Sequence, residues 1–158
     1  MVARKPPLYL VDASIYIFRH YFTLPPRWYS GEGYPTQAVY GYLGFLLGML
    51  EQVQPQFMVV AFDESLGQCF RNTIYPDYKA NRELPDDALA FQLRACAEVT
   101  TILGISALAS NSHEADDIIG TLAERGRNEG HPIAVISGDK DLAQLLQDDD
   151  ALLWDVGR

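Results

Sequence analysis

The chain has 158 residues, of which 48% are hydrophobic and 21% charged, which suits one globular domain with a real core and excludes a disordered chain. Twelve basic against 21 acidic residues give a net charge of −9, which on its face argues against a nucleic-acid partner. No apolar run approaches the ~20 residues of a membrane helix, and the N-terminus has no signal-peptide core. We therefore expect a cytoplasmic protein without membrane contact, in which Cys69 and Cys96 are buried free thiols.

In chain order, strand-like apolar runs alternate with segments of helical periodicity. The pattern predicts strands at 8–11, 57–62, 105–109, 132–136 and 151–154, and helices at 13–22, 36–53, 86–103, 114–129 and 140–146. A Pro- and Gly-rich loop covers 24–35, and a polar, aromatic and basic segment without clear period covers 64–87. Unbroken apolar strands that alternate with helices predict a single α/β domain with a mostly parallel sheet and helices on both faces.

Seven acidic residues follow the predicted strands, and they are expected at one edge of the sheet, outside the carboxyl ends where parallel sheets bind ligands. They are Asp12, Asp63, Glu114, Asp116, Asp117, Asp139 and Asp141. Any one of them could simply cap a helix, but a helix start uses one or two such residues, so capping does not account for all seven. Without them the net charge would be −2, which means that the acidity is concentrated rather than spread.

Carboxylates gathered this closely repel one another, and Lys140 is the one basic residue expected near them, so a bound cation must offset the repulsion. Because the set has neither His nor Cys, its hard oxygen ligands favour Mg²⁺ or Mn²⁺ over zinc. The number of carboxylates suggests two ions, which in phosphodiester cleavage activate a water and stabilise the leaving oxygen. The same repulsion predicts that Asp117→Asn or Asp139→Asn leaves the metal-free fold intact or stabilises it.

The segment 71–82 carries three of the twelve basic residues together with two tyrosines. Arg71, Lys79 and Arg82 offer phosphate contacts, while Tyr75 and Tyr78 offer stacking faces. An ordinary solvated loop explains this composition equally well. Beside a metal site, however, the combination indicates a clamp for substrate phosphates, and the residues alone predict a metal-dependent phosphoesterase acting on a nucleic acid.

Two other phosphoryl-transfer arrangements are worth comparing. An aspartyl-nucleophile phosphatase needs Asp-x-Asp after the first strand, where this chain has Asp12-Ala13-Ser14. A topoisomerase-primase type domain uses a Glu with an Asp-x-Asp, which Asp139-Lys140-Asp141 could imitate. That scheme leaves the acidic residues after the first two strands unexplained.

Five motifs in this order, spread over the whole chain, resemble those of the structure-specific 5′ nucleases, which include the N-terminal 5′–3′ exonuclease domain of bacterial DNA polymerase I and the flap endonucleases. They are Leu10-Val11-Asp12-Ala13-Ser14, Phe62-Asp63, Tyr78-Lys79-Ala80-Asn81-Arg82, Glu114-Ala115-Asp116-Asp117-Ile118-Ile119-Gly120-Thr121-Leu122-Ala123 and Ser137-Gly138-Asp139-Lys140-Asp141-Leu142. The resemblance implies a three-layer PIN-like (resolvase-like) domain over 1–158. It also implies a monomeric 5′–3′ exonuclease or flap endonuclease, which uses two Mg²⁺ ions near a 5′ end, flap or nick in DNA, or near an RNA primer. The alternative is a nuclease-like module that binds metal or partners without cleaving.

The resemblance also implies roles for single residues. The first metal would be organised by Asp12, Asp63, Glu114, Asp116 and Asp117, with Asp139 between the two sites and Asp141 at the second. Lys79 and Arg82 match the family's active-site bases, which steer the scissile phosphate. Arg71 and Tyr78 match positions that line the same passage, and 64–87 matches the start of the family's arch or clamp.

The resemblance ends at the C-terminus. Family members continue into a helix-three-turn-helix segment that grips the DNA duplex and carries two further aspartates for the second metal. This chain ends at Arg158, just after the last predicted strand. We therefore expect that the C-terminal DNA-binding part is absent from it.

Overall fold

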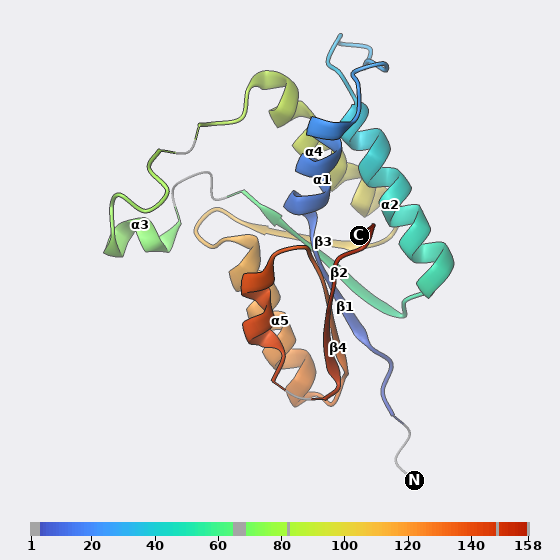
Figure 1. Ribbon diagram of the computed structural model, residues 1–158, viewed down its shortest axis with the longest axis vertical. Helices are drawn as coiled ribbons and strands as arrows, with labels where there is room; N and C mark the ends of the chain where they lie inside the picture. The colour runs from blue at the N-terminus through green and yellow to red at the C-terminus, as the bar shows by residue number, and fades with distance from the viewer. Residues whose placement is uncertain (1–3, 65–68, 82, 148, 158) are drawn as a thin grey trace.

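The computed structural model describes residues 4–64, 69–81, 83–147 and 149–157. Its strands are β1 (Leu8–Asp12), β2 (Phe57–Asp63), β3 (Ser106–Ser110), β4 (Ile133–Ile136) and β5 (Ala151–Trp154). Its helices are α1 (Ala13–Thr23), α2 (Gln37–Val53), α3 (Phe70–Ile74), α4 (Asp87–Ile102), α5 (Ala115–Asn128) and the 3₁₀ helix η1 (Lys140–Leu145). The strands form one sheet in the order β3-β2-β1-β4-β5, and every pairing in it is parallel (Figure 1).

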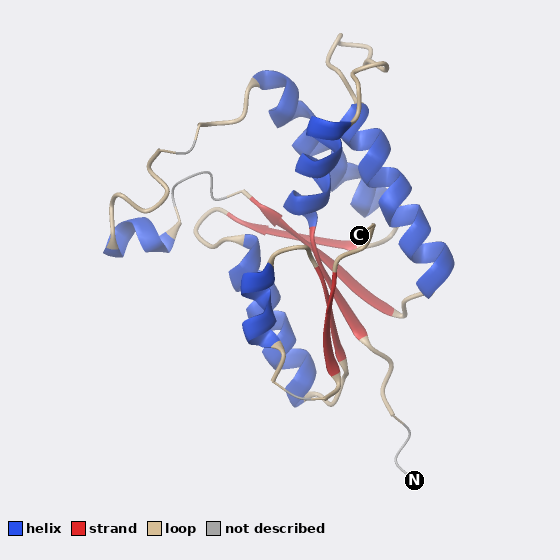
Figure 2. Ribbon diagram, in the orientation of Figure 1, coloured by secondary structure: helices blue, strands red, loops and turns tan. Residues whose placement is uncertain are grey.

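Helices cover both faces of the twisted sheet, which confirms the predicted α/β architecture (Figure 2). On one face α1, α2 and α4 pack over Val11 and Val60, and on the other α5 packs over Leu10 and Ala61. Successive residues of one strand therefore enter opposite cores, because side chains alternate across a strand. This double burial explains why the strands have no polar alternation in the sequence.

Local chemistry fixes several helix ends. The Asp86 side chain accepts a hydrogen bond from the Leu89 N–H at 2.8 Å, which caps the N-terminus of α4. Beyond the end of α4, Gly104 has φ +78°, a left-handed conformation that costs glycine little. A Cβ at Gly41 would overlap the His20 ring, so this glycine lets α1 and α2 pack closely.

The predicted elements are all present, with ends that differ by at most one residue from the expected ones. Two details were wrong. The segment 70–74, expected to be irregular, forms the short helix α3, which is too short for an apolar period to develop. The helix expected at 140–146 is a 3₁₀ helix over 140–145, whose first turn is held by the Asp139 side chain.

Two further expectations concern the whole chain. Cys69 and Cys96 are both buried and unpaired, as expected. Within the described residues, no helix combines the length and the apolar character needed to cross a membrane.

The order of the strands creates a switch point at the centre of the sheet. From β1 the chain moves outward to β2 and β3, and it then crosses to the other side of β1 to form β4 and β5. In parallel sheets, such a switch point at the carboxyl edge is where ligands bind. Asp12 ends β1, and Asp139 lies three residues beyond β4. The fold therefore places these two carboxylates on either side of the switch point.

Candidate functional site

All seven predicted acidic residues lie at the carboxyl edge of the sheet, as the topology requires. Hydrogen bonds and charge interactions divide five of them into two groups, which meet at Asp116, because Glu114 and Asp117 also act on its charge. The central group, at the switch point, consists of Asp12, Asp116 and Asp139. The α5 pair consists of Glu114, the N-cap of α5, and Asp117 in its first turn.

Asp12 is the most constrained member of the central group. Its side chain is buried and accepts a hydrogen bond from the Ser137 hydroxyl at 3.0 Å. The pKa of Asp12 is raised to about 6, chiefly by burial and also by the nearby charges of Asp116 and Asp139, against the opposing effect of the Ser137 hydrogen bond. The carboxylate therefore lies where negative charge is already in excess.

The other two members share this environment. Burial and then the charges of Asp139 and Glu114 raise the pKa of Asp116, against the opposing charge of Lys79. One oxygen of Asp139 accepts the Asp141 N–H at 2.9 Å. In the part of the chain that the structure describes, no Lys, Arg or His forms an ion pair with any member of the central group.

The α5 pair is neutralised by bases from the segment after β2. Arg71 donates two hydrogen bonds of 2.7 Å to the oxygens of Asp117 and one of 3.3 Å to Glu114. Lys79 donates to Glu114 at 2.5 Å, and the Tyr78 hydroxyl donates to it at 3.2 Å. The hydrogen bonds from Arg71 lower the pKa of Asp117. The expectation that Lys140 alone lies near the acidic residues was therefore wrong for this half of the site.

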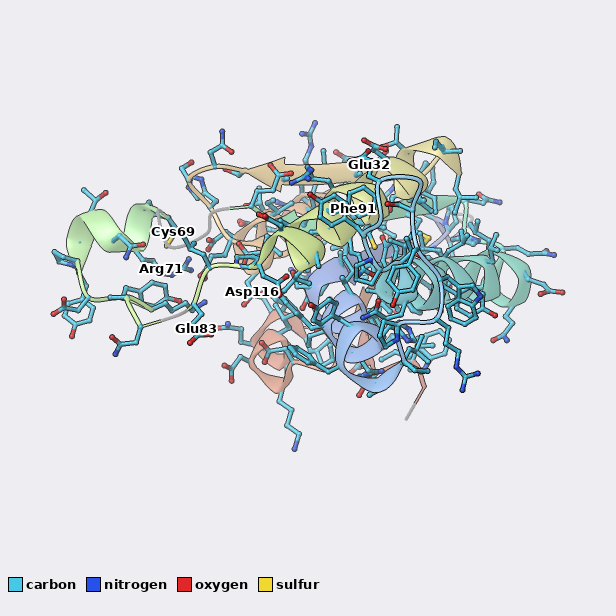
Figure 3. The ribbon with its side chains drawn as sticks, turned by 90° about the horizontal axis from the view of Figure 1, so that it is seen from above. Glu32, Cys69, Arg71, Glu83, Phe91 and Asp116 are labelled. Carbon is cyan, nitrogen blue, oxygen red and sulfur yellow. The ribbon has the colours of Figure 1, made fainter. Side chains whose placement is uncertain are left out.

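The bases come from a segment, 69–81, that is docked on the N-terminal end of α5. The Phe70 N–H donates to the Ser112 carbonyl at 2.7 Å, and the Phe70 ring lies 5.1 Å from the ring of His113. Within the segment, the Asn72 amide donates to the Tyr78 carbonyl at 2.8 Å, just before Lys79. Figure 3 shows this segment, with Arg71 and Cys69, projecting from the body of the domain beside Asp116. Arg82 lies outside the described residues.

The two remaining acidic residues belong to neither group. Asp63 is half-buried at the end of β2, and Asp141 is exposed in the first turn of η1. Among the described side chains, no three His, Cys, Asp or Glu converge tightly enough to hold one ion by themselves. The donor set nonetheless fits Mg²⁺, which has oxygen ligands and is usually held by one or two carboxylates together with waters.

Ser137 is the site residue that sequence reasoning missed. Its hydroxyl is completely buried and contacts both Asp12 and the backbone of Asp139. In the sequence it is the first residue of a Ser-Gly turn after a strand, which is ordinary turn composition. The signal that could have revealed its role was its position. It follows β4, whose carboxyl end lies next to the end of β1, where Asp12 is.

Comparison with known proteins agrees with this geometry. Residues 7–157 match the family model described as "5′-3′ exonuclease, N-terminal resolvase-like domain". The chain belongs to this 5′–3′ exonuclease family. The exonuclease-family domain is 40% identical to DNA polymerase I of Mycobacterium tuberculosis over 95% of its own length. It is 38% identical to the 5′–3′ exonuclease of Aquifex aeolicus over 89% of its length.

The exonuclease-family domain covers only part of these proteins, 17% of the polymerase and 48% of the exonuclease. Among solved structures, the T5 D15 protein, co-crystallised with metal ions, matches with a TM-score of 0.69 at 19% identity. That match covers 94% of this chain and 53% of the T5 protein. A T5 D15 flap endonuclease complex with DNA and metal ions matches with a TM-score of 0.65 at 18% identity. These likenesses confirm the fold.

Proposed function

We propose that this exonuclease-family domain hydrolyses phosphodiester bonds near the 5′ ends of DNA with the help of Mg²⁺ or Mn²⁺. The observation that carries the proposal is the central group. Its three carboxylates repel one another, the pKa values of Asp12 and Asp116 are raised, and a docked segment with basic residues lies beside them. Lys79 offsets the charge of Asp116 only in part, so gathering these carboxylates is costly, and a divalent cation would remove the cost. Family membership supports the same chemistry.

In this proposal the central group holds the metal, and two ions bind in the complete site. Asp63, Glu114, Asp117 and Asp141 would contribute directly or through waters, and Asp139 would serve both ions. Divalent ions at such a site supply a nucleophilic water and stabilise the leaving oxygen. The protein would hold the carboxylates in place. Asp12 ends β1, Asp139 follows β4, and Asp116 lies in the first turn of α5.

The docked segment is proposed to bind the substrate phosphate. Lys79 and Arg71 already form hydrogen bonds with carboxylate oxygens at 2.5 and 2.7 Å, and a phosphodiester offers oxygens of similar charge and geometry. Lys79 Nζ also lies 5.0 Å from the centroid of the Tyr78 ring, which provides a stacking surface next to the cation. We assign Arg82 the same role in binding phosphate, because it lies in a motif that resembles that of the family.

The proposed substrates are DNA with a 5′ flap, a nick or a free 5′ end, and RNA primers. The names of the relatives support this choice, since they include DNA polymerase I and 5′–3′ exonuclease, and a T5 flap endonuclease is described in complex with DNA. We further propose a monomer that acts in cytoplasmic DNA replication and repair, where buried free thiols such as Cys69 and Cys96 persist.

The test is cleavage of a fluorescent 5′-flap duplex by the 158-residue chain in Mn²⁺ or Mg²⁺, with and without chelator. We expect metal-dependent cleavage that falls by at least about 100-fold in Asp116→Asn, because the central group loses a ligand charge. Glu124→Gln, an exposed change further along α5, is the matched control and should cleave normally. Metal binding without cleavage would favour a module that binds but does not cut, and absence of metal binding would refute the proposal.

A further inference from the structure

We infer that Ser137 is a positioning residue of the metal site, whose hydroxyl sets the distance between the carboxylates of Asp12 and Asp139. The inference rests on the proposed function, because it assigns Ser137 a role in metal binding. Asp12 belongs to β1 and Asp139 follows β4, so the two carboxylates are 127 positions apart in the chain and share no local backbone constraint. The β1–β4 pairing ends at Val11 and Ile136, so it does not reach Asp12 and Asp139 themselves.

The Ser137 hydroxyl is placed to connect Asp12 with the turn that carries Asp139. It donates to Asp12 Oδ2 at 3.0 Å and accepts the Asp139 N–H at 3.0 Å. Its own backbone N–H donates to the Trp154 carbonyl of β5 at 3.1 Å. A hydroxyl can donate and accept at once, which neither an ammonium nor an aliphatic side chain can do. One buried oxygen thus connects the carboxylate on β1 to the turn that carries Asp139.

The same turn is supported on its other side. A Cβ at Gly138 would lie 3.0 Å from Asp155 Oδ2, so the turn packs directly against this carboxylate. Asp155 is in turn held by Arg19, whose guanidinium donates to Asp155 Oδ1 at 2.7 Å and to the Val156 carbonyl at 2.9 Å. The turn is therefore fixed against the C-terminal residues, and Ser137 fixes it to β1.

Loss of the hydroxyl has two consequences that can be separated. It removes a buried hydrogen bond, which lowers stability as at any buried site. It also frees the Asp12 side chain and the Asp139 backbone from each other, which should weaken metal binding. Partners that orient metal-binding side chains typically contribute about 10- to 100-fold to metal affinity. A purely structural serine would affect stability alone.

Tyr42→Phe provides the matched control for the structural effect. The Tyr42 hydroxyl lies 2.7 Å from Thr100 Oγ1, both residues are completely buried, and they belong to α2 and α4 on one face of the sheet. This change removes one buried hydroxyl hydrogen bond and leaves the described contacts of Asp12 and Asp139 unchanged.

The experiment measures Mn²⁺ binding to the 158-residue chain by electron paramagnetic resonance, in parallel with thermal melts in chelator. We expect Ser137→Ala to lower Mn²⁺ affinity by about 10- to 100-fold, and Ser137→Thr, which retains the hydroxyl, to restore most of it. Tyr42→Phe should lower the melting temperature but bind Mn²⁺ as the wild type does. Ser137→Cys, which retains the shape and a weak donor, should show a smaller loss and replaces Ser137→Ala if that variant does not fold.

Three results separate the inference from the proposed function. Wild-type affinity in folded Ser137→Ala or Ser137→Cys would overturn the inference and leave the proposed function standing. An equal loss of affinity in Tyr42→Phe would also overturn it, because general destabilisation would then explain the effect. A wild-type chain that binds no Mn²⁺ would overturn both.

Discussion

Asp116 and Asp117 are neighbours in the first turn of α5, yet their electrostatic surroundings are opposite. Asp117 has two hydrogen bonds from Arg71 and a lowered pKa, whereas Asp116 faces Asp139 and Glu114 and has a raised pKa. The same division holds for the α5 pair and the central group as wholes. The α5 pair forms direct ion pairs with Arg71 and Lys79, whereas in the central group Lys79 only partly offsets the negative charge at Asp116.

This difference indicates two different roles for the acidic residues, which their number alone does not reveal. In the α5 pair the carboxylates dock the segment 69–81 on the domain, so their charge contributes to the folded structure. In the central group the charge is unfavourable for the folded chain, and the proposed cation would offset it. Four predictions test this division, from the largest expected effect to the smallest.

Lys79→Ala should have the largest effect, and it should fall on catalysis. A cation on the reacting phosphate stabilises charge that develops in the transition state, which is worth about 10²- to 10³-fold in rate. We therefore expect the single-turnover cleavage rate of a 5′-flap substrate to fall by this factor, with a much smaller change in DNA affinity. If only the affinity falls, Lys79 is a backbone contact, and its pairing with Glu114 is its main role.

The central group should make the metal-free fold less stable as the pH rises. The pKa of Asp12 is about 6 in the folded chain, against 3.8 as the ordinary value. The stabilising contribution of the protonated form is complete below pH 4 and is lost as the pH rises through 6, a loss on the order of 3 kcal/mol. Urea unfolding in chelator at pH 4 and pH 7 should show this loss in the wild type and little of it in Asp12→Asn. An equal pH dependence in both proteins would contradict the assignment.

Arg71→Met should destabilise the metal-free fold, because it removes the only described ion-pair partner of Asp117 and one of the two of Glu114. Hydrogen bonds to charged groups contribute about 1.5–3 kcal/mol each, so a loss of at least about 2 kcal/mol in the free energy of unfolding is expected by urea titration. Arg125→Met is the control, since Arg125 pairs with the exposed Glu129 at 3.4 Å and should contribute less than about 0.5 kcal/mol. Equal losses in the two variants would show that the Arg71 contacts do not hold the segment.

The sharpest comparison uses the two adjacent aspartates. In chelator, Asp116→Asn should raise the free energy of unfolding by about 1 kcal/mol through relief of repulsion, and Asp117→Asn should lower it by a similar amount. Thermal melts of the two variants side by side measure both changes. This corrects the sequence-based expectation that Asp117→Asn is neutral or stabilising, because Arg71 now accounts for the Asp117 charge. Changes of the same sign in both variants would remove the basis for two groups.

The fold and the position of the site could be predicted from the sequence because they follow from local patterns. Apolar runs without alternation predicted the parallel sheet, and the rule for its carboxyl edge placed all seven acidic residues correctly. The pairing of Arg71 with Asp117 depends on how the segment 69–81 docks on α5, which no local period encodes. The role of Ser137 was missed for the same reason, since its partner Asp12 lies at the other end of the chain.

The parallel sheet also has a kinetic consequence. None of its pairings can start from a hairpin, because parallel neighbours need a crossover between them. The hydrogen bond between Ser137 and Asp12 closes a loop of 125 residues, and β4 can pair with β1 only after most of the chain exists. Such non-local contacts slow folding, and their loop-closure entropy is lost before they contribute stability. We expect metal affinity to emerge late in refolding, with the slowest phase, so that Mn²⁺ binding serves as a readout of complete folding.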